Sequence, residues 1–260
     1  MSVRSDIGRA GVLRALHRPG DPLVLPNAWD AGTARAVEAA GFPAVATSSA
    51  AVAESLGYAD GEATPPGEML AAVARVARAV AVPVTADLER GYGMAPTELV
   101  ERLAATGAVG CNLEDSDPRT GELVDPQEQA DFLAAVRAAA DDAGVDLVLN
   151  ARVDVYLAGG TGDPTERLAE AVRRARRYAA AGADCVYPIG ATGPDDLRAL
   201  VRDAGAPVNV LFRPGAPSLP QLAEFGVARV SFGGGLYRAA RADHGRMLDA
   251  VRAGRDPYRP

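Results

Sequence analysis

Residues that carry nucleophilic and transition-metal chemistry are scarce in this sequence. Its 260 residues include two cysteines and two histidines. Cys111 and Cys185 stand at the start of apolar, strand-like runs, where small buried thiols are common. His17 and His244 fall in predicted helices near the ends of the chain, where we expect surface positions. A disulfide, a cysteine or histidine metal site and a Cys-His or Ser-His nucleophilic pair are therefore not expected.

Dense positive charge and long apolar segments are missing as well. The formal net charge is −7, from 27 basic and 34 acidic side chains. The one basic cluster, Arg-Arg-Ala-Arg-Arg at positions 173–177, lies in a predicted helix and is expected to form a solvated face, so neither nucleic acid nor a membrane is an expected partner. The first six residues do not resemble a signal peptide, and no apolar run is long enough to span a bilayer. We expect a cytoplasmic protein that binds a small molecule.

Short β-rich runs alternate with alanine-rich helical stretches eight times along the chain. The predicted strands are Leu23–Ala28, Ala44–Ser49, Pro83–Glu89, Val109–Asp115, Asp146–Asp154, Cys185–Ile189, Pro207–Phe212 and Arg229–Gly233. The predicted helices are Ala31–Ala40, Pro66–Val80, Pro96–Thr106, Pro126–Ala143, Pro164–Ala181, Pro194–Ala204, Leu219–Phe225 and Leu236–Ala253. Proline at or beside several helix starts and glycine after many helix ends agree with these boundaries.

Eight βα units without a linker predict one (β/α)₈ barrel of the TIM type, as a single domain over residues 1–260. Residues 1–20 are expected to add a helical extension, and residues 236–260 the last helix and a tail. A doubly wound sheet is the alternative. It would normally have fewer strands and a glycine fingerprint after the first strand, which the Pro-Asn-Ala-Trp-Asp run at positions 26–30 does not contain.

Two acids stand at the end of the third predicted strand, in the run Asp-Leu-Glu-Arg-Gly-Tyr-Gly at positions 87–93. Because strand side chains alternate, Asp87 and Glu89 are expected to point to the same side, and the glycines let the chain turn away. Paired carboxylates repel each other unless a cation or a shared proton relieves them, and hard oxygen ligands suit Mg²⁺ or Mn²⁺. Two solvated acids at a strand edge are the alternative.

Polar residues also end the neighbouring strands, where barrels of this type place their active sites. The candidates are Thr47, Ser48 and Ser49 after strand 2, Asn112 and Glu114 on strand 4, Asn150, Arg152 and Asp154 on strand 5, Asn209 on strand 7, and a glycine loop at 233–235. Acids and arginines facing a barrel interior are costly unless they are paired or bind something. An internal salt bridge of Arg152 with Glu114 is one solution; a ligand site across three consecutive strands is the one we favour.

Taken in order, these residues resemble the isocitrate lyase/phosphoenolpyruvate mutase superfamily, over about residues 23–240. Members of that superfamily are (β/α)₈ barrels that bind Mg²⁺ and a 2-oxo or enol acid, and they cleave or form C–C or P–C bonds beside that group. The resemblance implies a metal shell of Asp60, Asp87, Glu89 and Glu114, in part through water. It also implies substrate binding by Thr47, Ser48, Ser49, Arg152 and Asn209. Finally, it implies a homo-oligomer, dimer or tetramer.

The sequence departs from the best-known members in two places. Isocitrate and methylisocitrate lyases carry a Lys-Lys-Cys-Gly-His loop after strand 4, whereas residues 116–123 here read Ser-Asp-Pro-Arg-Thr-Gly-Glu-Leu. Phosphonomutases use an asparagine in that loop and a histidine at strand 6, where this chain has Tyr187. The remaining branch contains decarboxylase-like and lyase-like members.

We therefore expect a Mg²⁺- or Mn²⁺-dependent lyase that acts on a 2-oxo or 2-hydroxy di- or tricarboxylic acid through a metal-stabilised enolate, with Arg152 and Glu114 as catalytic residues. Decarboxylation of an oxaloacetate-type acid is favoured over retro-aldol cleavage, because the latter needs a base and the candidates are Glu114 and the tyrosines at 58, 92 and 187. The alternatives are a phosphonate- or phosphoenol-processing enzyme and a catalytically silent barrel that binds a dicarboxylate.

Overall fold

The computed structural model describes residues 8–157 and 162–259. Its strands are β1 (Leu23–Leu25), β2 (Asn27–Ala28), β3 (Val45–Thr47), β4 (Val84–Asp87), β5 (Gly110–Leu113), β6 (Val148–Arg152), β7 (Cys185–Tyr187), β8 (Asn209–Leu211) and β9 (Arg229–Ser231). Its helices are α1 (Arg9–Ala15), α2 (Ala31–Ala39), α3 (Ser49–Leu56), α4 (Pro66–Ala79), α5 (Pro96–Thr106), α6 (Pro126–Asp142), α7 (Pro164–Ala180), α8 (Pro194–Asp203), α9 (Leu219–Glu224) and α10 (Gly235–Arg252).

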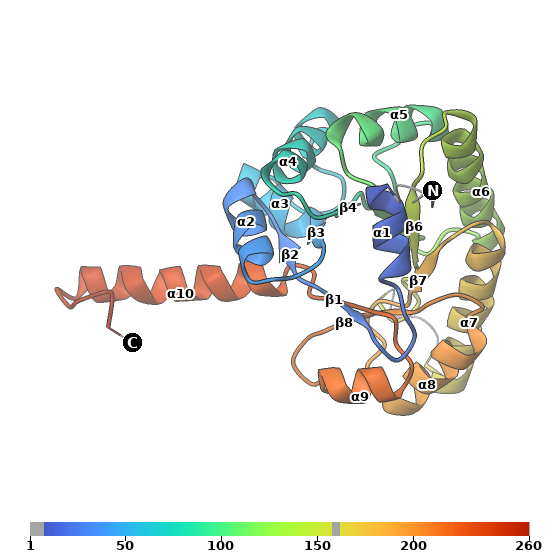
Figure 1. Ribbon diagram of the computed structural model, residues 1–260. Helices are drawn as coiled ribbons and strands as arrows, with labels where there is room; N and C mark the ends of the chain where they lie inside the picture. Colours follow the sequence, from blue (N-terminus) through green and yellow to red (C-terminus); the bar gives the residue numbers. More distant parts are fainter. Residues whose placement is uncertain (1–7, 158–161, 260) are drawn as a thin grey trace, which may run out of the picture.

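The strands form a closed parallel barrel with helices around it (Figure 1). Strands β1 and β2 are two halves of one strand that is interrupted at Pro26, which has no amide hydrogen for a ladder bond. The first half pairs with β9 and the second with β3, while a bridge between Val186 and Val208 joins β7 to β8. With these halves counted together, eight strands close the ring, so the predicted (β/α)₈ barrel is confirmed and the doubly wound sheet is wrong.

Helix α1 closes the amino end of the barrel. Its Leu13 is fully buried and packs with Leu23 and Val148, the first residues of β1 and β6, and with Leu25. The predicted extension over 1–20 thus contains a helix, although residues 1–7 lie outside the described part. Because α1 covers this end, the carboxyl ends of the strands remain as the open face on which a ligand site can form.

The structure corrects three local predictions. Residues 49–56 form α3, which the sequence reading missed, and the second strand therefore ends at Thr47. His17 follows α1 and is 8% exposed, because it lies between α1 and the barrel and not at the surface as predicted. The basic cluster does not form a wholly solvated face, since Arg174 within it is 5% exposed. Both cysteines are buried and free, as expected.

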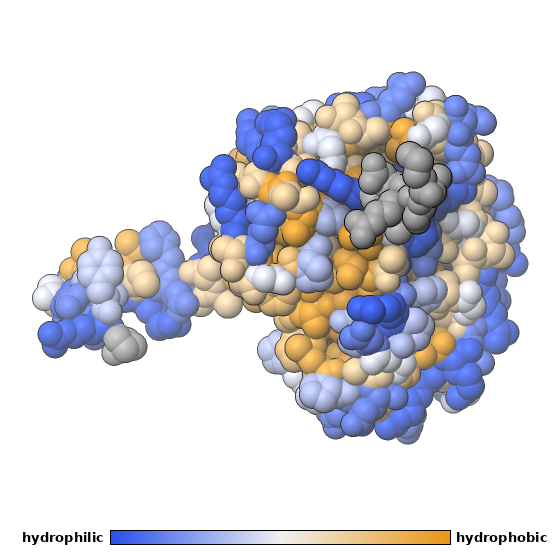
Figure 2. All heavy atoms as spheres, in the orientation of Figure 1, coloured by the Kyte–Doolittle hydropathy of each residue, from blue (hydrophilic) through white to orange (hydrophobic). Residues whose placement is uncertain are grey.

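The last helix leaves the barrel. Figure 1 shows α10 projecting away from the other helices, and Figure 2 shows apolar and hydrophilic side chains mixed along it. Of the α10 residues, all of which the structure describes, only Tyr237 is buried, and it packs edge-on against Trp29 at 5.1 Å between ring centroids. Across residues 8–157 and 162–259, none of the helices is both long and apolar enough to cross a membrane.

Candidate functional site

A cavity of 720 Å³ opens at the carboxyl ends of the strands. Its polar lining includes Ser48, Ser49, Asp60, Asp87, Asn112 and Arg152, which come from four different βα units. Its outer wall is largely apolar and includes Ile189, Phe212 and Phe232, the two phenylalanines lying 5.6 Å apart between ring centroids. The cavity thus combines charged groups at one end with an apolar wall at the other, as small-molecule sites commonly do.

Asp87 is the best-anchored carboxylate in the cavity. One of its oxygens, Oδ2, accepts hydrogen bonds from the Ser49 amide at 3.0 Å and the Ser49 hydroxyl at 2.9 Å. Its own amide donates to Thr47 Oγ1 at 3.0 Å, and the Asn112 amide group donates to Oδ1 at 3.4 Å. Helix α3 therefore holds Asp87 at its amino terminus, where the helix dipole favours negative charge.

The residues that the resemblance assigns to substrate binding after β3 make different contacts. Thr47 is fully buried and Ser49 bonds to Asp87, so both support the carboxylate. Ser48 caps α3 by accepting from the Ala51 amide at 3.4 Å, and it lines the cavity. Among the described residues that line the cavity, Ser231 is present but Asn209 is not; Asn209 donates to the Ser231 hydroxyl at 3.1 Å from behind the wall.

Glu89 does not follow strand alternation as predicted. Strand β4 ends at Asp87, and Glu89 adopts a left-handed backbone conformation with φ 48°. Its carboxylate is buried and accepts from the Glu62 amide at 2.7 Å and from the Tyr92 hydroxyl at 2.6 Å. Burial, together with the weaker effect of the negative charges of Asp60 and Asp87, raises the pKa of Glu89 to about 7.

Asp60 is a further member of the acidic cluster, the name used here for the four candidate metal ligands Asp60, Asp87, Glu89 and Glu114. It lies in the connection between α3 and α4 and lines the cavity. Loss of solvent around its carboxyl group raises its pKa, and the charge of Asp87 adds to this effect. Asp60, Asp87 and Glu89 therefore lie close enough to repel one another, which is the electrostatic situation that a bound cation relieves.

Arg152 is held by two carboxylates at the end of β6. Its Nε and Nη2 atoms donate to the two oxygens of Asp154 at 2.6 Å and 2.9 Å, and its Nη1 atom forms an ion pair with Glu114. Burial raises the pKa of Glu114 well above its usual range, and the charge of Arg152 opposes that shift. The internal salt bridge of Arg152 with Glu114 is therefore present, and Arg152 also lines the cavity in which a ligand could bind.

The acidic cluster suits a magnesium ion. Its four candidate ligands, Asp60, Asp87, Glu89 and Glu114, offer only carboxylate oxygens, which Mg²⁺ prefers. Within the described part of the chain, no three acidic, histidine or cysteine side chains gather closely enough to ligate one ion directly. Mg²⁺ usually keeps several waters and contacts one or two carboxylates, so this donor set fits an ion bound partly through water.

The sequence analysis did not identify two arginines that line the cavity. Arg213 follows strand β8 and Arg238 lies in the second turn of α10, and both line the cavity. Arg213 lies two residues after the end of β8, so including the residues that follow each strand would have identified it. No pattern in the sequence around Arg238 points to the cavity. Tyr187, one of the candidate bases named from the sequence, is buried in the cavity wall, and burial raises its pKa to about 12.

A second cavity, of 970 Å³, lies beside the first under the loop that follows β5. Its lining includes Glu62, Tyr92, Asp117 and Arg119. The Tyr92 hydroxyl donates to Glu89, which connects this cavity with the acids described above. We assign the ligand site to the first cavity because Asp87 and Arg152 line that one.

Comparisons with known proteins agree with the fold and identify the family. A model of the phosphoenolpyruvate phosphomutase family matches residues 13–252. A phosphonomutase-like protein of Burkholderia cenocepacia J2315, whose structure is solved, is 45% identical with a TM-score of 0.88 over 93% of this chain and 99% of its own. A functionally uncharacterised protein of Mycobacterium tuberculosis is 38% identical over 87% of this chain and 85% of its own length.

An oxaloacetate decarboxylase of Rhodopseudomonas palustris is 32% identical over 77% of this chain and 69% of its own length. Further similar proteins carry the names 2-methylisocitrate lyase, 2,3-dimethylmalate lyase and phosphonopyruvate hydrolase. The family model spans most of the barrel, from Leu13 in α1 to the end of α10. This chain therefore belongs to the isocitrate lyase/phosphoenolpyruvate mutase superfamily.

Proposed function

We propose that this protein is a Mg²⁺-dependent carbon–carbon lyase that acts on a 2-oxo or 2-hydroxy di- or tricarboxylic acid through an enolate. The observation that carries the proposal is the placement of Asp60, Asp87 and Arg152 around one cavity. A cation beside the acids and the guanidinium opposite them would suit a substrate with a carboxylate next to an oxygen that becomes negative.

The amino-acid composition limits which group can accept the electron pair of the broken C–C bond. The chain has no lysine, because all 27 basic residues are arginines. A Schiff base between a lysine and a 2-oxo acid is therefore unavailable to these 260 residues. Asp87 would be the principal residue that holds Mg²⁺, with Asp60, Glu89 and Glu114 contributing mainly through water, and the ion would supply positive charge beside the 2-oxo group.

The residues of the chain account for binding and charge compensation. Arg152 would bind a substrate carboxylate and offset the charge of the enolate, while Asp154 and Glu114 fix its orientation. In the decarboxylation of an oxaloacetate-type acid, the bond from C3 to its carboxyl group breaks, the electron pair moves onto the 2-oxo oxygen and CO₂ leaves. Solvent then protonates C3.

Decarboxylation is our first candidate because it needs no strong base. The bases considered for retro-aldol cleavage are engaged: Glu114 pairs with Arg152, and Tyr92 donates to Glu89. Tyr58 donates to Glu68 on the surface, at 2.8 Å. Tyr187, with a pKa of about 12, keeps its proton at neutral pH. The similarity to oxaloacetate decarboxylases supports the same choice.

A phosphonate- or phosphoenol-processing enzyme is the second candidate. The cavity lining includes the Ser48 hydroxyl and the glycines at 233–235, whose amides are suited to a phosphoryl group. Similarity to a phosphonopyruvate hydrolase points the same way. The loop at 116–123 lacks the asparagine of the phosphonomutases, so we rank this candidate below the lyase.

Two measurements test the proposal. A melting curve with Mg²⁺ plus oxalate, which resembles an enolate of a 2-oxo acid, should show stabilisation greater than with either alone. An Mg²⁺-dependent activity panel of oxaloacetate, 2-methylisocitrate, 2,3-dimethylmalate and phosphonopyruvate then separates the candidates. Turnover of phosphonopyruvate alone would favour the second candidate. Absence of metal-dependent oxalate stabilisation and of all turnover would leave a silent dicarboxylate-binding barrel and refute the lyase.

Arg152→Lys tests the role given to the guanidinium. Lysine is a point charge and cannot replace the bidentate contact to a carboxylate. If Arg152 stabilises the enolate, the variant should lower kcat as well as raise KM on the best substrate of the panel. A lowered melting temperature with unchanged kinetics would remove Arg152 from the active site.

A further inference from the structure

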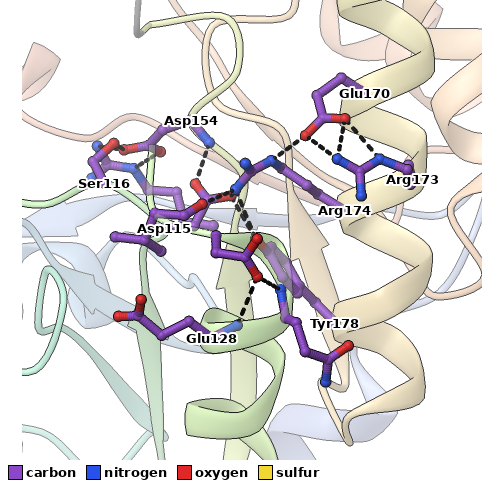
Figure 3. Close-up of polar contacts among 12 residues, drawn as sticks. Asp115, Ser116, Glu128, Asp154, Glu170, Arg173, Arg174 and Tyr178 are labelled. Atoms are coloured by element: carbon purple, nitrogen blue, oxygen red, sulfur yellow. Dashed lines mark hydrogen bonds and ion pairs between the residues drawn. The ribbon is translucent and has the colours of Figure 1, made fainter. Parts of the chain in front are cut away.

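A buried polar network joins Asp115 and Asp154, which binds Arg152, to helix α7. Figure 3 shows Arg174 and Tyr178 of α7 pointing toward Asp115. The outermost cation of this network is Arg174, a member of the basic cluster at 173–177. The neighbouring Arg173 shows what a solvated member looks like: its side chain is 51% exposed, against 6% for Arg174, although both pair with Glu170. Arg174 is therefore not a solvated surface residue, and its burial needs another explanation.

The guanidinium of Arg174 is surrounded by acceptors from three parts of the chain. Its Nη1 atom lies 2.9 Å from Asp115 Oδ2, 3.0 Å from the Val124 carbonyl oxygen and 3.2 Å from the Tyr178 hydroxyl. Its Nε atom donates to Glu170 at 2.6 Å. A planar fork of donors suits such a set of partners, whereas a lysine ammonium would cover fewer of them.

Asp115 connects Arg174 to Asp154. It is fully buried at the end of β5, and its Oδ1 atom accepts from the Asp154 amide at 2.8 Å. Tyr178 donates to its other oxygen at 2.7 Å. Both oxygens are thus used, one toward α7 and one toward the turn that follows β6.

Asp154 is the last link before the cavity. Its carboxylate, 1% exposed as a residue, binds Arg152 through both oxygens and also accepts from the Ser116 hydroxyl at 2.7 Å. The path from Arg174 to Arg152 therefore runs through two adjacent buried carboxylates. Such carboxylates repel each other, so a cation is needed on each side. Arg152 stands on the cavity side and Arg174 on the helix side.

We propose that Arg174 is a positioning residue for the cavity: by holding Asp115, it fixes Asp154, which in turn fixes the orientation of the Arg152 guanidinium. The consequence for substrate binding rests on the proposed function, whereas the effect on Arg152 itself does not. Arg174 touches neither the cavity nor the acidic metal candidates, so its loss acts only through this path or through stability.

The test compares Arg174→Met with Arg173→Met, a matched control on the same helix that also loses a contact to Glu170. The first readout is solvent exchange of the Arg152 Nε–H, followed by nitrogen-15 NMR and assigned from its loss in Arg152→Lys. We expect exchange about tenfold faster in Arg174→Met than in the wild type, and no change in Arg173→Met. Equal exchange in all three folded proteins would overturn the proposal.

The second readout is calorimetry with Mg²⁺ alone and with oxalate in the presence of Mg²⁺. Arg174→Met should bind oxalate about tenfold more weakly because Arg152 is misplaced, while the affinity for Mg²⁺ alone stays the same. Unchanged oxalate affinity, or an equal loss of Mg²⁺ affinity, would contradict a positioning role. If the wild type neither binds oxalate nor turns over any acid of the panel, the proposed function fails, and the exchange rate of Arg152 still decides whether Arg174 positions it.

Tyr178→Phe keeps the test decisive if Arg174→Met does not fold. It removes only one hydroxyl, which donates to Asp115 and accepts from Arg174, and it keeps the ring and the net charge. It should change both readouts in the same direction by a smaller factor. Arg174→Lys, which keeps the charge but not the fork, should fall between the wild type and Arg174→Met, and full rescue by lysine would contradict the geometry proposed here.

Discussion

Asp87 is the residue on which the proposed metal site depends most. It stands at the end of β4, in the centre of the acidic cluster, and Ser49, Thr47 and Asn112 hold it in place. Asp87→Ala should weaken Mg²⁺ binding by about two orders of magnitude, because it removes one charge and one oxygen ligand. Calorimetry with Mg²⁺ measures this directly.

The fold of the Asp87→Ala variant should survive, because the change lies at a strand end and not among the packed side chains of the barrel. We expect a modest loss of stability from the Ser49 donors that it leaves unpaired, about 1–3 kcal/mol. Asp141→Ala, at an exposed position near the end of α6, is the control and should bind Mg²⁺ like the wild type. Wild-type affinity in Asp87→Ala would refute the site assignment.

The burial of His17 makes the free energy of unfolding depend on pH. Its Nδ1–H donates to the Leu13 carbonyl oxygen at 2.8 Å, and burial, followed by the charge of Arg229, lowers its pKa to about 4. In the unfolded chain the pKa of histidine is about 6.5. Between these values the unfolded state binds a proton that the folded state does not, so the free energy of unfolding falls as the pH decreases from about 6.5 to 4.

We therefore expect His17→Gln to be less sensitive to acid than the wild type. Urea unfolding at about pH 7 and about pH 4.5 should show a drop in the free energy of unfolding that is smaller in the variant by about 2–3 kcal/mol. His244→Gln, on the exposed face of α10, is the control and should follow the wild-type curve. An identical drop in all three proteins would show that His17 does not carry this dependence.

At the scale of elements, strand β5 depends on a glycine. A side chain at Gly110 would place its Cβ atom 2.9 Å from the Val148 carbonyl oxygen, 3.0 Å from Thr85 Oγ1 and 3.1 Å from a Leu13 methyl group. These contacts belong to both neighbouring strands and to α1. The absence of a side chain therefore lets α1 approach the end of the barrel.

Gly110→Ala should destabilise the protein by about 1–3 kcal/mol, because the neighbours on three sides must move. Gly67→Ala is the matched control in the first turn of α4: its Cβ would meet only Arg102 at 3.8 Å. Since alanine favours helix, that variant should be as stable as the wild type or more stable by about 0.5–1 kcal/mol. Thermal unfolding that ranks Gly110→Ala above Gly67→Ala would contradict the packing described here.

At the scale of the whole molecule, helix α10 exposes apolar side chains that another protein chain could cover. Met247, Leu248 and Val251 are 43%, 55% and 59% exposed, and their spacing places them on one stripe of the projecting helix. An isolated helix with an exposed apolar stripe gains stability by covering it. We propose that a second copy of this chain covers it, giving a homo-oligomer.

Light scattering should give a mass that is a multiple of 26.7 kDa, with dimer or tetramer expected. The double change Leu248→Asp and Val251→Asp should shift the mass toward the monomer, because two charges would have to be buried in the interface. Ala134→Asp, on the exposed side of α6, should leave the mass unchanged. A wild-type monomer at micromolar concentration would refute the proposal.

The barrel and the acidic cluster were predictable because their signals are local. Apolar runs of strand length, helices that begin at proline and glycine at helix ends recur with every βα unit, so counting them predicts the closed barrel. Asp87, Glu89 and Glu114 were identified because strand ends in a barrel converge on one face. Asp60 lies between α3 and α4, and only the resemblance to the superfamily pointed to it. Helix α3 was missed, since the run Ser-Ser-Ala-Ala at 48–51 begins a helix directly after a strand without a connecting turn.

What the sequence determined by itself is therefore the order of elements, the face that carries the site and the residue types gathered there. Tertiary structure decided which of those side chains meet the cavity and which serve one another. Strand alternation holds only while the backbone stays extended, and it stops before Glu89, whose φ is positive. The burial of His17 and Arg174, and the pairing of Arg152 with Asp154 and Glu114, are set by packing and by the cost of leaving buried charges unpaired, which depend on contacts between residues far apart in the chain.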